Sequence, residues 1–210
     1  MIQPLDFLLH LDRYLDILIN RYGTWIYGLV FLVIFAETGL VATPFLPGDS
    51  LLFALGTFAA RGVLNVESLF VLLAAAAILG DTVNYWVGYH AGQRVFHAKS
   101  RYFKKEYLER THAFYEKYGG LTIILARFIP VIRTFAPFVA GIGRMSYGRF
   151  LLYNVTGGLA WVTLFLSGGF FFGNLPIVQQ NFSLVVLGII LVSVLPALVG
   201  YIRSKYQPIR

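Results

Sequence analysis

Two charged residues, Glu37 and Arg127, lie inside apolar stretches of the sequence, and a proline follows each ten residues later, at Pro47 and Pro137. A charged side chain at the centre of a bilayer costs about 2.5 to 3.5 kcal/mol, so such a residue normally faces a partner, a cavity or a substrate. A proline removes a backbone donor and interrupts a helix. The chain therefore places a charge beside a helix break twice, which predicts a functional site.

Each of the two stretches carries a second charge of the same sign, Asp49 and Arg133. Arginine binds phosphate or carboxylate through two parallel hydrogen bonds and stays charged when desolvated, so Arg127 and Arg133 resemble a phosphate clamp. Glu37 and Asp49 could gain or lose a proton as the substrate comes and goes. We expect these four residues to bind substrate; the alternative is an ion-pair cluster that only locks the fold together.

A second polar cluster lies in the next apolar stretch, where Asp81, Asn84, Tyr85 and Gly88 recur on one face of a helix. This face is either a polar seam within the bundle or part of the site. We count Asp81 with Glu37 and Asp49 as residues that could couple transport to protons. The residues expected to support the site are Asn84, Tyr85, Pro47, Gly48, Pro130, Thr134 and Pro137.

Several kinds of chemistry find no support in the sequence. There is no cysteine, and the four histidines have no metal-ligand spacing. There is no phosphate-binding glycine loop followed by Lys-Ser or Lys-Thr, and no Gly-x-Ser-x-Gly nucleophile elbow. We therefore expect no catalytic residue, no metal and no cofactor, and we do not expect an enzyme.

The composition predicts that most of this chain lies in a lipid bilayer. Of its 210 residues 58% are hydrophobic and only 13% are charged, and no charged residue occurs between Arg149 and Arg203. Such a chain is an all-α, multi-pass integral membrane protein. Its length leaves room for one membrane domain, 1–210.

Prolines and segment lengths divide the domain. The stretch after Pro47 has about 11 residues, which at about 1.5 Å per residue reach half of a 30 Å hydrocarbon core. Residues 24–61 therefore predict a re-entrant helix pair, and 118–144 repeat the design. The expected order is an interfacial amphipathic helix 1–23, re-entrant pair 24–61, span 66–91, an amphipathic surface segment 93–117, re-entrant pair 118–144, and spans 147–172 and 182–202.

This order is an inverted repeat of a re-entrant pair plus one transmembrane helix, with three full spans in total. Because each copy crosses the membrane once, the second copy enters from the opposite face, as in many secondary transporters. Most lysines and arginines lie on the side of segment 93–117 and the C-terminal tail. The positive-inside rule makes that side cytoplasmic and places the N-terminal helix on the outer face.

Two further patterns concern partners. Gly88 with Gly92, and Gly169 with Gly173, are small residues four apart, which favours close helix packing and leaves a homodimer seam open. The basic segment 93–117 is expected to bind anionic lipid headgroups and not nucleic acid.

At the charged residues the chain resembles the DedA family of small bacterial membrane proteins, over about Gly23 to Trp161. The resemblance implies a translocase for a polyprenyl phosphate or phospholipid, above all the return of undecaprenyl phosphate across the cytoplasmic membrane, linked to the proton gradient. The buried acids and arginines of the family correspond here to Glu37, Asp49, Arg127 and Arg133. The segments that carry the resemblance are Phe35–Glu37, Pro44–Asp49, Gly80–Gly88 and Ala126–Thr134.

Three hypotheses follow. In the first, the protein is a lipid-phosphate flippase of the bacterial inner membrane that supports the cell envelope; Arg127 and Arg133 hold the phosphate, and Glu37 and Asp49 exchange protons. In the second, it is a proton-coupled transporter of small ions, in which the acids carry the ion and the arginines hold the fold. The third is an integral lipid enzyme, for which no nucleophile or metal motif is present.

Overall fold

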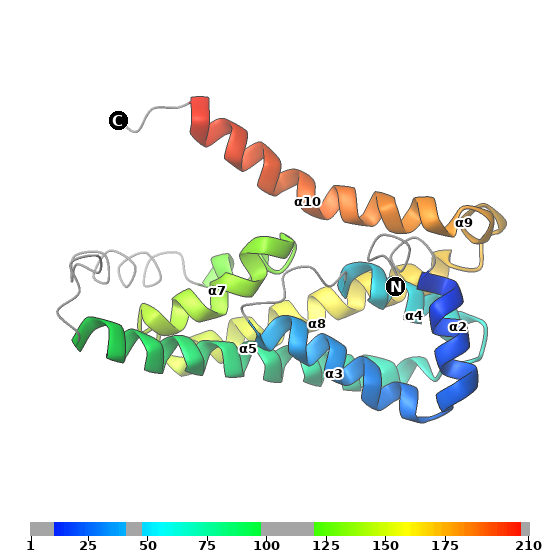
Figure 1. The fold of residues 1–210 in the computed structure, drawn as a ribbon, viewed down its shortest axis with the longest axis horizontal. Coiled ribbons are helices and arrows are strands. Elements are labelled where there is room, and N and C mark those ends of the chain that lie inside the picture. Colours follow the sequence, from blue (N-terminus) through cyan, green and yellow to red (C-terminus); the bar gives the residue numbers. More distant parts are fainter. Residues whose placement is uncertain (1–10, 41–47, 98–119, 207–210) are drawn as a thin grey trace, which may run out of the picture. The chain divides into compact units, whose positions relative to one another are not determined.

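Long apolar runs fold as helices because a helix satisfies its backbone hydrogen bonds within one segment, as lipid requires. The structure, a computed structural model, describes residues 11–40, 48–97 and 120–206, and these contain helices and turns with no strand (Figure 1). The predicted all-α class is confirmed for this part of the chain. The helices are α2 (Leu11–Tyr22), α3 (Trp25–Gly39), α4 (Gly48–Ala60), α5 (Val66–His97), α7 (Pro130–Ile142), α8 (Tyr147–Phe172), α9 (Pro176–Gln180) and α10 (Phe182–Tyr206).

The N-terminal helix α2 is amphipathic. Leu15 and Ile19 are buried, whereas Asp16 and Asn20, on the other side, are exposed. The helix ends at Gly23, whose φ of 53° favours glycine, and α3 begins two residues later. The amphipathic pattern predicted for 1–23 is thus present in the part that the structure describes.

Three helical stretches are long and apolar enough to cross a bilayer, judged by length and composition: Tyr14–Gly39, Val66–Ala91 and Tyr147–Phe172. The last two coincide with predicted spans. The first joins α2 and α3, which the sequence pattern assigned to an interfacial helix and to one arm of a re-entrant pair. Taken as one segment, α2 and α3 together are therefore long enough to cross the bilayer.

The third predicted span, 182–202, lies within α10, which continues to Tyr206. With 25 residues, α10 contains the whole predicted segment. The helix Gly48–Ala60 is apolar but shorter, as expected for an arm of a re-entrant pair.

The second helix break lies earlier than its proline pattern indicated. The chain turns at residues 127–129, and α7 begins with Pro130 and continues through Pro137. Pro130 fits the first helical position, where no intrahelical partner for an N–H exists. Pro137 lies inside α7, which continues to Ile142 although an interior proline removes one backbone hydrogen bond. The first break, with Pro47, lies outside the described residues.

The chain divides into two compact units, whose boundaries within described residues fall inside α3, α5 and α8. Unit 1 consists of Met1–Val33, Phe45–Leu73 and Val162–Arg210, and unit 2 consists of Ile34–Pro44 and Ala74–Trp161.

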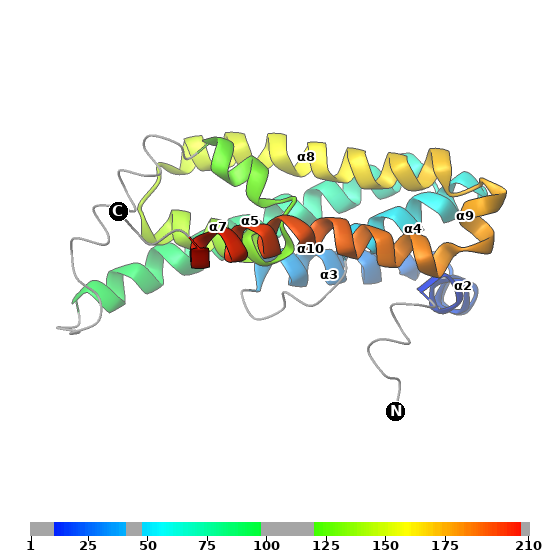
Figure 2. The same cartoon turned by 90° about the horizontal axis from the view of Figure 1, so that it is seen from above.

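In unit 1, α4 is buried along almost its whole length and packs against α8 and α10 (Figures 1 and 2). Glycines allow the close approach to α8. A Cβ atom on Gly56 would collide with the backbone of Leu166 and Phe170, and one on Gly169 would collide with the backbone of Phe53. The Thr57 hydroxyl also lies 3.4 Å from the Gly169 carbonyl oxygen, to which it donates.

In unit 2, α7 packs against α5 in the same manner. A Cβ atom on Gly88 would collide with the backbone of Phe138, and one on Gly141 would collide with the backbone of Tyr85 and Tyr89. The predicted role of Gly88 in close helix packing is therefore confirmed within this unit.

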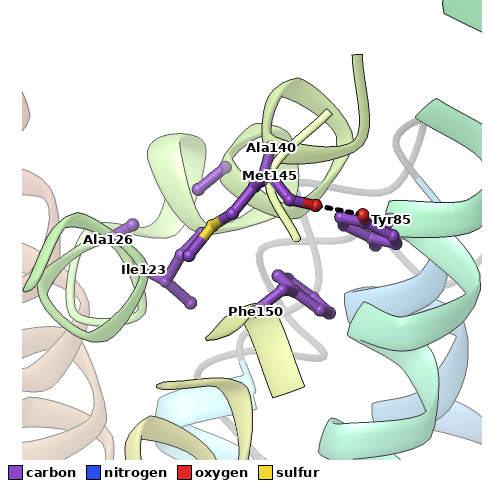
Figure 3. Packing of buried hydrophobic residues seen from close by; sticks show 7 residues of the cluster. Tyr85, Ile123, Ala126, Ala140, Met145 and Phe150 are labelled. Carbon is purple, nitrogen blue, oxygen red and sulfur yellow. Dashed lines mark hydrogen bonds between the residues drawn. The ribbon is translucent and has the colours of Figure 1, made fainter. Parts of the chain in front are cut away.

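Next to this contact lies a hydrophobic cluster built around Tyr85 and Phe150, whose rings stack with centroids 4.4 Å apart (Figure 3). Ile123, Ala126 and Met145 complete its centre. The Tyr85 hydroxyl donates a 2.5 Å hydrogen bond to the Met145 carbonyl. This bond satisfies the polar end of a buried ring, so Tyr85 contributes to packing.

Replacing Gly88 with valine should lower stability strongly, because the new side chain meets backbone atoms of Phe138 that cannot rotate away. Overpacking of this kind costs about 1 to 3 kcal/mol. The melting temperature in detergent measures the effect, and Gly28→Val is the matched control, because a Cβ atom at Gly28 meets nothing within 4 Å. Equal melting temperatures for the two variants would contradict the packing described.

Candidate functional site

The five charged residues singled out in the sequence are all buried. Their exposed fractions are 1% for Glu37, 6% for Asp49, 3% for Asp81, 4% for Arg127 and 6% for Arg133. Buried charges are expensive unless they are paired and hydrogen-bonded. The partners of each charge therefore decide what the cluster can do.

Arg133 and Glu37 form the first ion pair. Arg133 lies in the first turn of α7 and Glu37 in the last turn of α3, and Nη2 of the arginine donates to Oε1 of the glutamate. The guanidinium carbon also lies 4.9 Å from the ring centroid of Trp161, a fully buried residue of α8. Arg133 thus meets a carboxylate and the face of an aromatic ring, which attracts a cation.

Arg127 belongs to a separate ion pair. Its Nη2 atom lies 2.5 Å from Oδ2 of Asp81 on α5 and also donates to the side-chain and backbone oxygens of Asn154 on α8. The Asn154 amide in turn donates to the Ile78 carbonyl at 3.0 Å. The arginine at the break before α7 is thereby fastened to two helices.

Two glycines of α8 lie beside this arrangement. A Cβ atom on Gly157 would lie 3.1 Å from Cδ of Arg127, and one on Gly158 would lie 3.2 Å from Cγ1 of Ile78. Gly157 therefore lets α8 lie close to the Arg127 side chain, and Gly158 lets it lie close to α5.

The two arginines are paired with different acids, Arg127 with Asp81 and Arg133 with Glu37. Asp81, which the sequence left between a packing role and a site role, is the partner of Arg127. The other ion pair, Arg133 with Glu37, is the centre beside which Asn84 lies.

Asn84 lies fully buried on α5 and connects both elements of that centre. Its Nδ2 atom donates to the Thr38 carbonyl at 3.1 Å and to the Thr134 carbonyl at 2.7 Å. Thr38 follows Glu37, and Thr134 follows Arg133. The predicted supporting residues Asn84 and Thr134 are thus brought together beside the ion pair.

Asp49 belongs to unit 1, in the first turn of α4, which begins at Gly48. Its Oδ2 atom accepts a 2.6 Å hydrogen bond from the hydroxyl of Ser193 on α10. Carboxylates are favourable at helix N-termini, where backbone N–H groups lack helical partners. The structure thus gives Asp49 its own polar partner.

Three contributors were not recognised in the sequence: Asn154, Trp161 and Ser193. Each lies in a charge-free apolar stretch, so a buried polar or amphipathic side chain there was the available signal. Among the described residues, no group of three or more His, Asp or Glu side chains could hold a metal ion.

The chain is similar to known membrane proteins over most of its length. Residues 46–171 match the model of the VTT domain. The protein DedA of Escherichia coli strain K12 is 54% identical over 204 residues, covering 96% of this chain and 93% of DedA. No solved structure matches the chain.

More distant relatives are also membrane proteins by name. An uncharacterized membrane protein of Mycobacterium tuberculosis strain H37Rv is 43% identical over 87% of this chain and 81% of its own length. The inner membrane protein YqjA of E. coli K12 is 33% identical over 72% of this chain and 70% of YqjA. The family model covers more than half of the chain, and DedA matches nearly all of it; the chain is therefore a bacterial membrane protein that belongs to the DedA family.

Proposed function

We propose that this protein moves a lipid phosphate, either undecaprenyl phosphate or a phospholipid, across the cytoplasmic membrane in exchange with protons. The observation that carries the proposal is the buried ion pair between Arg133 and Glu37. Membership of the DedA family supports a role as a membrane transporter of the flippase kind. A transporter, and not an enzyme, also agrees with the absence of a recognisable nucleophile in the sequence.

The ion pair supplies a coupling mechanism. In the proposed exchange, Arg133 releases Glu37 as it binds the phosphate oxygens. The displaced carboxylate is then buried without that partner, a state whose cost is removed when Glu37 takes up a proton. Release of that proton restores the carboxylate, which competes with the phosphate for Arg133. One proton is thus bound for each monoanion bound, and the site keeps its net charge.

The other charges have different roles in this mechanism. Arg127, fastened to Asp81 and Asn154, positions the break that precedes α7 and so holds Arg133 in place. Asp49, with Ser193, is proposed as a second carboxyl group that binds and releases protons. The lipid tail stays in the bilayer, in contact with exposed apolar side chains.

The proposed inverted repeat is supported by a match between the two glycine contacts. Gly56 of α4 meets the twentieth and twenty-fourth residues of α8, Leu166 and Phe170. Gly141 of α7 meets the twentieth and twenty-fourth residues of α5, Tyr85 and Tyr89.

The match extends to the preceding turn of each short helix. Phe53, three residues before Gly56, meets Gly169, the twenty-third residue of α8. Phe138, three residues before Gly141, meets Gly88, the twenty-third residue of α5. Equal contacts at equal positions favour two copies of one unit. We propose that the copies are inverted, that their re-entrant pairs open alternately to the two sides, and that the C-terminus is cytoplasmic.

The proposal is tested with purified protein in liposomes. A short-chain polyprenyl phosphate is added, and its accessibility to a membrane-impermeant phosphatase is followed with and without a pH gradient. We expect protein-dependent movement between leaflets that the gradient accelerates. Glu37→Gln should bind the anion but lose the acceleration, because glutamine cannot exchange a proton.

Two outcomes would contradict the proposal. Protein-free liposomes that move the lipid as fast as liposomes with protein would exclude a flippase. A flux of protons or small ions that needs Glu37 but no lipid phosphate would favour the small-ion transporter instead.

A further inference from the structure

We propose that Asn84 is a positioning residue that sets how strongly Glu37 competes with a bound anion for Arg133. The inference rests on the proposed function, since it concerns the same ion pair. It begins from the two hydrogen bonds of one buried amide group, at 3.1 Å to the Thr38 carbonyl and 2.7 Å to the Thr134 carbonyl.

The orientation of this amide is fixed by its surroundings. Both partners are backbone carbonyls, which only accept hydrogen bonds, so the NH₂ end of Asn84 must face them. Both N–H groups are used, while Oδ1 accepts no hydrogen bond from the described residues. The amide therefore works as a bridge with two donors.

The bridge joins the residues next to the two ion-pair partners. Thr38 lies in the last turn of α3, where carbonyls lack an intrahelical donor, and it directly follows Glu37. Thr134 lies in the first half of α7 and directly follows Arg133. A movement of either backbone therefore changes the separation of Glu37 and Arg133, and Asn84 resists both movements.

The helix that carries Asn84 is itself held tightly against both elements. Four residues before Asn84, a Cβ atom on Gly80 would collide with the Thr38 side chain and the Phe35 carbonyl of α3. Four residues after it, a Cβ atom on Gly88 would collide with the backbone of Phe138 in α7. These three residues share one helix face. Close packing on both sides of Asn84 therefore holds this part of α5 in a fixed position against α3 and α7.

Removing the bridge should weaken the ion pair without removing either of its charges. Glu37 then competes less well for Arg133, so an anion binds more tightly and leaves more slowly. Two neutral hydrogen bonds of ordinary strength correspond to a change of about 30-fold in an equilibrium constant. Asn84→Ala should therefore bind the anion up to about 30-fold more tightly and translocate it more slowly.

The experiment measures binding of farnesyl phosphate to the detergent-purified protein by calorimetry at several pH values, and translocation of the same lipid in liposomes. We expect Asn84→Ala to show a lower Kd, a lower turnover and a flatter pH dependence of binding than wild type. Val83→Ala is the matched control, since Val83 precedes Asn84 on α5 and is 41% exposed. It should behave as wild type in both measurements.

The outcomes separate this inference from the proposed function. Tighter binding with slower turnover supports it, because a merely destabilised protein would lose both together. Binding by Asn84→Ala that is unchanged, or weakened in step with a lower melting temperature, overturns the inference alone. Wild-type protein that neither binds nor moves farnesyl phosphate overturns the proposed function, and the inference with it.

Discussion

Replacing Arg133 with alanine should reduce lipid-phosphate translocation about 100-fold while the protein remains folded. Arg133 is the cation of the Glu37 pair and is buried against Trp161. Truncating one partner of a buried, hydrogen-bonded charge pair costs about 2 to 5 kcal/mol of binding. The fold should survive because Glu37, left behind, can become neutral by binding a proton.

Two further variants show that the guanidinium group itself is required. Arg133→Lys keeps the positive charge but loses the planar fork that binds phosphate through two hydrogen bonds, so we expect it to remain well below wild type. The double variant Glu37→Ala with Arg133→Ala carries no charge at this place, so it should fold and still fail to translocate. Translocation in liposomes and the melting temperature in detergent are measured for each variant.

The result would contradict the proposed role if Arg133→Ala moved the lipid as fast as wild type. A folded Arg133→Ala protein that still binds farnesyl phosphate with unchanged affinity would also place the anion elsewhere. The binding measurement therefore accompanies the transport assay.

The second large effect is on stability and concerns the other pair. Asp81→Ala should lower the stability of the protein by about 3 to 5 kcal/mol, because it leaves the buried guanidinium of Arg127 without its acid. Arginine stays charged in proteins and cannot escape the penalty by losing a proton. A loss of this size is a large part of the 5 to 15 kcal/mol that typically separates folded from unfolded protein.

A double replacement distinguishes a charge penalty from lost packing. Changing Arg127 to methionine and Asp81 to leucine together removes both charges and keeps apolar volume, which in buried pairs is often neutral. We expect the double variant to melt well above the single variant Asp81→Leu, so that the two changes are strongly non-additive. Thermal melts of Arg127→Met, Asp81→Leu and the double variant in one detergent give this coupling.

Additive effects of the two changes would mean that Asp81 and Arg127 do not depend on each other. A melting temperature of Asp81→Ala equal to that of wild type would mean that the pair does not stabilise the fold. The two ion pairs are thus expected to differ in role. Loss of Asp81 should mainly lower stability, and loss of Arg133 should mainly lower transport.

The different roles of the two ion pairs could not be predicted from the sequence, although the burial of their residues could. The sequence predicted the burial of the five charged residues, because a long apolar chain with isolated charges has to place them away from lipid, and all five are buried. It also predicted the helical segments 66–91 and 147–172, since uninterrupted apolar length is a local property. The second break, predicted from the end of the apolar run at Arg127 to Pro137, covers only residues 127–129, because Pro130 fits the start of a helix and Pro137 lies inside it.

The lipid environment, the helices and the residue types of the site could thus be predicted from the sequence. The structure was needed to show which acid faces which arginine: Glu37 pairs with Arg133 and Asp81 with Arg127, across 96 and 46 positions of the chain. It also brought Asn154, Trp161 and Ser193 to the charged residues. The physical reason is that burial and helix length follow from local composition, whereas a pairing depends on how closely distant helices approach, which the glycines of α4, α5, α7 and α8 permit.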